Sequence, residues 1–135
     1  LRSESPEAFN LLSKVVRKYR CVDADTGWYL EAKGRVIEVN ESGNVTAIRH
    51  NDLDRLPACL EREGESLLRE AHLLWDDILG RDEGRLVLDL KRGDTVVVAN
   101  QRCLHGRYSF TTSAHEPRVV MGCYVSQDEL NSRFR

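Results

Sequence analysis

The sequence predicts a mainly β fold with one inserted helix, in an antiparallel two-sheet or jelly-roll arrangement. Six or seven short segments carry β-branched runs or alternating apolar residues, which is typical of strands. Turn residues separate these segments, and one longer segment with helical spacing of its apolar residues interrupts them. At 135 residues the chain is one domain at most.

The first half of the chain is expected to open with a helix and continue as hairpins. Ser5 suits an N-cap, Pro6 the first helical position and Glu7 the first turn, so a helix is predicted from Pro6 to just before Val15. The polar stretch 40–44 predicts the clearest hairpin of the chain. The strands expected here cover residues 15–22, 28–32, 35–39 and 45–49.

The second half is expected to contain the long helix and the remaining strands. Apolar residues recur at helical spacing over 59–79, with fraying near Gly64 and a cap at Gly80. Ser126 is expected to begin a terminal helix. The strands expected here cover residues 85–90, 95–99 and 118–125. Trp28 and Trp75 are predicted in the core, and His72 and His115 at the surface.

The composition excludes several classes of partner. The net charge is −2 and the Lys and Arg residues are evenly spread, which argues against nucleic-acid binding. No apolar run reaches membrane-spanning length and no signal-peptide pattern is present, so the expected partner is a small molecule. The cysteines lack zinc-site spacing and are predicted to be buried free thiols: Cys21, Cys59, Cys103 and Cys123. Because the chain begins with Leu1, it is expected to be a processed or truncated product.

Functional side chains gather between residues 93 and 124. His105 follows the predicted strand 95–99, and alternation on the next strand places Arg118 and Tyr124 on one face. A guanidinium on a strand that faces a core needs a partner. That partner is either an anionic ligand or a structural Asp or Glu.

One motif in this stretch resembles a known family. It reads Asn100-x-Arg102-x-x-His105-Gly106-Arg107, followed by Arg118 and then Gly122-x-Tyr124. This is similar to the C-terminal part of the gamma-butyrobetaine dioxygenase and trimethyllysine dioxygenase family of oxygenases. The family has Asp-Asn-Trp-Arg where this chain has Ala99-Asn100-Gln101-Arg102. The similarity begins loosely near Pro6 and becomes close from Gly93.

The resemblance implies a fold and a reaction. The fold is the double-stranded β-helix of 2-oxoglutarate oxygenases, incomplete because residues 1–135 match only the C-terminal part of a family catalytic domain. The reaction is hydroxylation of an unactivated C–H of a trimethylammonium amino acid, with gamma-butyrobetaine giving carnitine and trimethyllysine as the alternative substrate. The implied cofactors are Fe(II) and the cosubstrate 2-oxoglutarate, with ascorbate as reductant.

The resemblance also implies roles for single residues. His105 would be the distal iron ligand, and Arg118 would hold the distal carboxylate of 2-oxoglutarate. Tyr124 would belong to an aromatic cage around the trimethylammonium group, and Asn51 would help to hold the substrate. Imidazole is a good iron ligand, a guanidinium matches a carboxylate with two bonds, and a phenol ring attracts a quaternary ammonium.

The second His and the carboxylate of the iron site are open to two interpretations. The pattern His50-x-Asp52 would complete a triad with His105 within this chain. The family, however, keeps its His-x-Asp motif earlier, before the segment that matches residue 1. On that basis His105 is the expected iron ligand, and this chain alone is expected to be inactive.

The sequence is also consistent with a chain that catalyses nothing. Such a chain could be a non-catalytic fragment or a β domain that binds a small anion through Arg118. The expected compartment is the cytoplasm, with the mitochondrion as the alternative. A homodimer of the whole protein is a further possibility.

Overall fold

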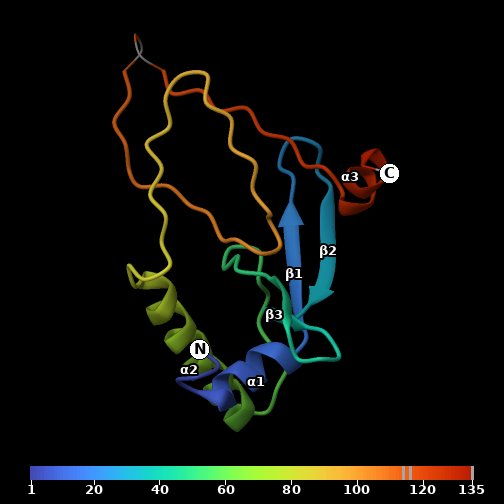
Figure 1. Ribbon diagram of the computed structural model, residues 1–135. Helices are drawn as coiled ribbons and strands as arrows, with labels where there is room; N and C mark the ends of the chain where they lie inside the picture. The colour runs from blue at the N-terminus through green and yellow to red at the C-terminus, as the bar shows by residue number, and fades with distance from the viewer. Residues whose placement is uncertain (114, 116, 135) are drawn as a thin grey trace. The chain divides into compact units, whose positions relative to one another are not determined.

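The computed structural model describes residues 1–113, 115 and 117–134, which fall into two units, Leu1–His105 and Gly106–Arg135. Each unit is described by itself. The first unit begins with a helix, continues through two antiparallel hairpins and ends its regular structure with the long helix (Figure 1). Its elements are α1 (Pro6–Lys14), β1 (Arg17–Val22), β2 (Tyr29–Gly34), β3 (Ile37–Val39), β4 (Val45–Ile48) and α2 (Arg62–Gly80). The second unit contains α3 (Gln127–Arg133).

Helix α1 begins and ends as the sequence predicts. The Ser5 hydroxyl accepts a hydrogen bond from the Ala8 amide at 3.1 Å, which satisfies one of the free N–H groups of the first turn. Lys14 is the last helical residue, because Val15 is extended while its amide still donates to the Leu11 carbonyl. The predicted boundaries of this helix are confirmed.

The four strands form two separate two-stranded sheets. β1 pairs with β2 from Arg17 opposite Gly34 to the turn, and β3 pairs with β4 with an irregularity after Glu38. In the β3–β4 turn the Asn40 side chain accepts from the Asn44 amide at 2.8 Å, and Gly43 takes a left-handed φ of 78°. The hairpin predicted around residues 40–44 is confirmed.

Helix α2 differs from its prediction at both ends. It begins at Arg62 and runs without interruption through Gly64. Its C-cap is Arg81 and not Gly80, because the Arg81 amide still donates to the Ile78 carbonyl. Arg81 also pairs with Glu4 and Asp77 at 2.8 Å each, so its side chain ties the end of α2 to the start of the chain.

The core lies where α1, α2 and β3 pack together (Figure 1). Its buried members are Ala8, Leu12, Val36, Ile37, Leu68, Ala71 and Trp75. The prediction that Trp75 is a core residue is confirmed. The same prediction for Trp28 is wrong, because Trp28 lies at the β1–β2 turn and is 71% exposed.

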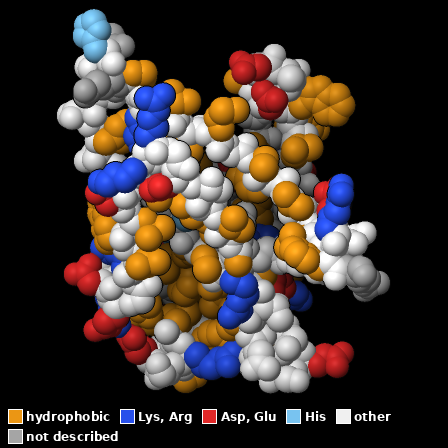
Figure 2. All heavy atoms as spheres, turned by 45° about the horizontal axis from the view of Figure 1, so that its top comes forward, with side chains coloured by type: hydrophobic (Ala, Val, Ile, Leu, Met, Phe, Trp, Pro, Cys, Tyr) orange, Lys and Arg blue, Asp and Glu red, His pale blue; other side chains and the backbone are white. Residues whose placement is uncertain are grey.

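The strands predicted at 85–90, 95–99 and 118–125 are not formed. The described residues between α2 and α3 contain no strand, and a jelly-roll is not found. A strand requires a hydrogen-bond ladder to a neighbouring backbone, and these segments form no such ladder among the described residues. Their apolar side chains are exposed, up to 93% for Val97 and Met121, and Figure 2 shows hydrophobic side chains spread over one face. The fold is therefore a small mixed one, with helices and short antiparallel strands.

Two further findings concern the surface. The four cysteines are free but exposed, so the prediction of buried thiols is wrong. Among the described residues no strand pairing covers Cys103 or Cys123, and β1, which carries Cys21, pairs with β2 alone. None of the helices in the described residues has the length and apolar character needed to span a bilayer.

Candidate functional site

The loop that carries His105 is fixed to β4 by Gln101 and by the motif residue Arg102. The Gln101 carbonyl accepts from the Ile48 amide at 2.8 Å, and the Arg102 guanidinium donates to the Val45 carbonyl. These contacts use backbone groups of β4 and give Arg102 a structural role. His105 follows three residues after Arg102, and its side chain is exposed.

His50 and Asp52 lie just after β4 and are close to helix α2. The Trp75 indole N–H donates to Nδ1 of His50 at 3.2 Å, and the two rings meet edge to face. Asp52 pairs with Arg55 at 2.8 Å. Asp76, the neighbour of Trp75 on α2, completes a group in which one ligand atom from each of His50, Asp52 and Asp76 lies within 4.8 Å of the others.

This grouping bears on the predicted iron site. Within the described part of the chain, the group of potential metal ligands that includes His50 and Asp52 has Asp76 as its third member and not His105. An Fe(II) site of this oxygenase class needs two His and one carboxylate on one face. The described residues therefore fit such a site only in part, with His105 as a single candidate ligand.

Asn51 holds the turn between His50 and α2. Its Oδ1 accepts from the amides of Leu53 and Asp54 at 3.1 and 3.4 Å, and its Nδ2 donates to the Asp54 carboxylate at 2.6 Å. This is the side-chain-to-backbone bonding typical of Asn in turns. A substrate-binding role for Asn51 stays a prediction.

A buried polar cluster at the start of β1 was not predicted. Arg17 and His72 are each 7% exposed, and Arg55 donates to Nδ1 of His72 at 2.9 Å. Burial, and then the charges of Arg55 and Arg17, lower the pKa of His72 to about 4. The Arg17 Nε, the Tyr19 hydroxyl and the His72 Nε2 have no hydrogen-bond partner among the described residues.

The prediction that His72 is a surface residue is wrong. The spacing of the apolar residues along α2 already indicated that this position is buried. His72 lies four residues after Leu68 and three before Trp75, so it shares the buried face of α2 with both. A neutral imidazole fits this position because Arg55 supplies the donor for its Nδ1. Hydrophobic spacing alone could not show that a polar ring would find this partner.

In the second unit, two guanidinium groups meet one aromatic ring. The Arg107 and Arg118 guanidinium carbons lie 4.8 and 5.0 Å from the centroid of the Phe110 ring. In the part of this unit that the structure describes, Arg118 makes no ion pair with a carboxylate, so the structural Asp or Glu considered for it is not found there. Tyr124 is 89% exposed.

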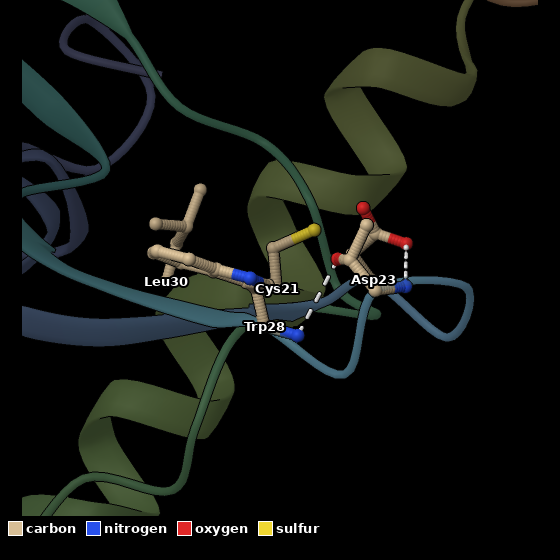
Figure 3. A pocket seen from close by; sticks show the side chains of 5 residues that line it. Cys21, Asp23, Trp28 and Leu30 are labelled. Carbon is tan, nitrogen blue, oxygen red and sulfur yellow. Dashed lines mark hydrogen bonds between the residues drawn. The ribbon is translucent and has the colours of Figure 1, made fainter.

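A shallow hollow on the β1–β2 hairpin contains none of the predicted site residues. Figure 3 shows Cys21, Trp28 and Leu30 along it, with Asp23 at its end. Hydrogen bonds between Asp23 and the Thr26 and Trp28 backbones hold the turn in shape. The lining offers no group of ligands or catalytic side chains, so we do not assign a function to this hollow.

The comparisons with known proteins support the family resemblance. The chain is 26% identical over 141 residues to gamma-butyrobetaine dioxygenase from Homo sapiens, and all of the chain is covered. It is 31% identical over 138 residues to trimethyllysine dioxygenase from Neurospora crassa, again with all of the chain covered. The resemblance to these dioxygenases is confirmed. The mitochondrial trimethyllysine dioxygenase of Gallus gallus is likewise 31% identical over 138 residues.

The chain matches only part of each relative, which limits the properties that the similarity can assign to this chain. The chain spans only 35% of the human relative, 28% of the Neurospora one and 32% of the Gallus one. No family model matches the chain. The relatives are named as dioxygenases of two different substrates, so the similarity supports a dioxygenase and does not decide between the substrates.

Proposed function

We propose that this chain is part of an Fe(II)- and 2-oxoglutarate-dependent dioxygenase that hydroxylates an unactivated C–H of a trimethylammonium amino acid. The proposed substrate is gamma-butyrobetaine, which gives carnitine, and trimethyllysine is the alternative. The observation that carries the proposal is the similarity of the whole chain to dioxygenases of these two substrates. The motif from Asn100 to Arg107 adds the residue types that such a site needs.

On this proposal His105 supplies one ligand to the iron. The exposed His105 side chain follows a loop that the Arg102 and Gln101 contacts fix to β4, which would limit the positions of the imidazole. The other ligands would come from polypeptide outside residues 1–135, and residues 1–135 alone would be inactive. Bound iron would supply the oxygen chemistry, with ascorbate keeping the metal reduced.

Arg118 would bind the distal carboxylate of 2-oxoglutarate. It already lies over the Phe110 ring, as Arg107 does, which concentrates positive charge around one ring. A guanidinium fork binds a carboxylate through two parallel hydrogen bonds and keeps its remaining face for the aromatic contact. Tyr124 and Asn51 would contact the trimethylammonium substrate.

We propose the cytoplasm as the compartment and the mitochondrion as the alternative, and a homodimer of the whole protein stays a prediction.

The first experiment uses this chain with Fe(II), ascorbate, 2-oxoglutarate and gamma-butyrobetaine, and measures succinate release. We expect no turnover by the folded chain. Turnover that both His105→Ala and Asp52→Ala abolish would instead mean that His50-x-Asp52 completes the iron site within this chain.

The second experiment tests the function itself. A chimera carries this chain in place of the aligned part of the human gamma-butyrobetaine dioxygenase. We expect succinate release that depends on gamma-butyrobetaine and is lost in His105→Ala, and a raised KM for 2-oxoglutarate in Arg118→Ala. A chimera that melts cooperatively but releases no succinate with either substrate would contradict the proposal. It would favour a non-catalytic domain that binds a small anion through Arg118.

A further inference from the structure

We propose that His50, Asp52 and Asp76 bind a divalent transition-metal cation, at a site that does not use His105. One ligand atom from each of these residues lies within 4.8 Å of the other two. Ligands that hold a metal at about 2.0–2.2 Å lie at most about 4.4 Å apart. Small side-chain rotations therefore suffice to bring the three atoms to ligand spacing.

The fold brings these residues together from two separate elements. His50 and Asp52 follow β4, whereas Asp76 lies on α2 beside Trp75. The Asn51 turn fixes the backbone between the first two ligands. Trp75 holds the His50 ring from the same turn of α2 that presents Asp76. In the metal-free chain the His50 ring is therefore held in place, and the two carboxylates are exposed to solvent.

The charges around His50, Asp52 and Asp76 are compatible with a bound cation. Asp52 pairs with Arg55 at 2.8 Å, but a carboxylate has two oxygens and can keep this contact while it binds a metal. Among the described residues Asp76 makes no ion pair, so its charge is uncompensated. One imidazole nitrogen with carboxylate oxygens suits Zn²⁺, Mn²⁺ or Co²⁺ better than Mg²⁺ or Ca²⁺, which prefer oxygen ligands alone.

The hydrogen bond from Trp75 makes the proposal measurable. Because the indole N–H donates to Nδ1, the neutral His50 ring carries its proton on Nε2. A metal at Nδ1 would replace the indole, and a metal at Nε2 would move the ring proton to Nδ1. Either event ends the bond, so metal binding should change the fluorescence of Trp75. Because the metal must replace this hydrogen bond, we expect its affinity to be weak.

The test titrates metal-free chain, without a histidine tag, with Zn²⁺, Mn²⁺ and Co²⁺. A Trp28→Phe background leaves Trp75 as the reporter, since these are the two tryptophans of the chain. We expect a saturable one-site change and a loss of affinity of about tenfold or more in Asp76→Asn and in His50→Gln. Asp77→Asn, the neighbouring exposed carboxylate on the same helix, and His105→Ala should leave the affinity unchanged.

Three outcomes would overturn the proposal. The first is no saturable binding by a chain whose circular dichroism shows it folded. The second is an affinity that His105→Ala lowers and Asp76→Asn does not, which would point to the triad of His50, Asp52 and His105. The third is equal binding of Mg²⁺. None of these readouts depends on dioxygenase turnover, so the proposed function stands or falls separately.

Discussion

Acidification should destabilise the first unit through His72. The ring has an ordinary pKa of 6.5 when the chain is unfolded, and burial lowers its pKa to about 4 in the folded state. Between these values the unfolded chain binds more protons, so stability falls as the pH drops from 6.5 towards 4. The full difference is about 3 kcal/mol, at about 1.4 kcal/mol for each pH unit.

The measurable part of this loss lies between pH 7.5 and 5.0. At pH 5.0 the two pKa values give a loss of about 2 kcal/mol. Carboxylates such as Glu4 and Glu31, whose pKa values are lowered by hydrogen bonds from Arg81 and Arg20, lose their contribution only at lower pH. Between pH 7.5 and 5.0 the loss of stability therefore reports on His72 and not on these carboxylates.

Urea unfolding followed by the fluorescence of the buried Trp75 measures the effect. A loss of about 2 kcal/mol lowers the urea midpoint by about 1 M for a domain of this size. His72→Gln cannot titrate, so it should remove most of the pH dependence, while His115→Gln in the exposed loop should keep it. An NMR titration that places the His72 pKa near 6.5, or an unchanged pH dependence in His72→Gln, would refute the reasoning.

Three further predictions concern stability. Leu12→Ala removes a side chain with 0% exposure and should cost about 2–5 kcal/mol in urea unfolding, whereas Leu53→Ala at 97% exposure should change stability by less than about 0.5 kcal/mol. Ser5→Ala removes the N-cap of α1 and should cost about 0.5–2 kcal/mol, with Ser5→Asp retaining most of the stability. The chain alone should self-associate as its concentration rises, because unpaired apolar segments are exposed, so the unfolding measurements above use dilute protein; a preparation that stays monodisperse at high concentration would contradict this.

The elements that the sequence predicts well are those fixed by neighbouring residues. The Ser5 cap, the Pro6 start and the polar turn at 40–44 act over a few residues, and each is found where it was expected. The strand patterns at 85–90, 95–99 and 118–125 depend on partners far away in the chain or outside it. A β-branched run shows that a segment suits a sheet, but it does not supply the neighbouring strand.

For the candidate site, too, the sequence predicts some features and misses others. The motif predicts His105 and Arg118 as a pair of functional side chains, and their roles stay predictions. The role of Arg102 in fixing the loop to β4 was not predicted, because the residue spacing contains no information on the backbone that it reaches. The place of Asp76 beside His50 was not predicted either, since it requires the packing of α2 against the segment after β4.

The loop that precedes His105 also covers the free edge of strand β4. Strand β4 pairs with β3, and the loop contacts β4 at Val45 and Ile48, where backbone groups would otherwise be free to pair with another molecule. A substitution at Arg102 would therefore release the loop and uncover the strand at the same time. In the chimera with the human relative, such a variant should lose turnover and gain a tendency to self-associate, so the lost turnover should not be read as evidence that Arg102 takes part in the chemistry.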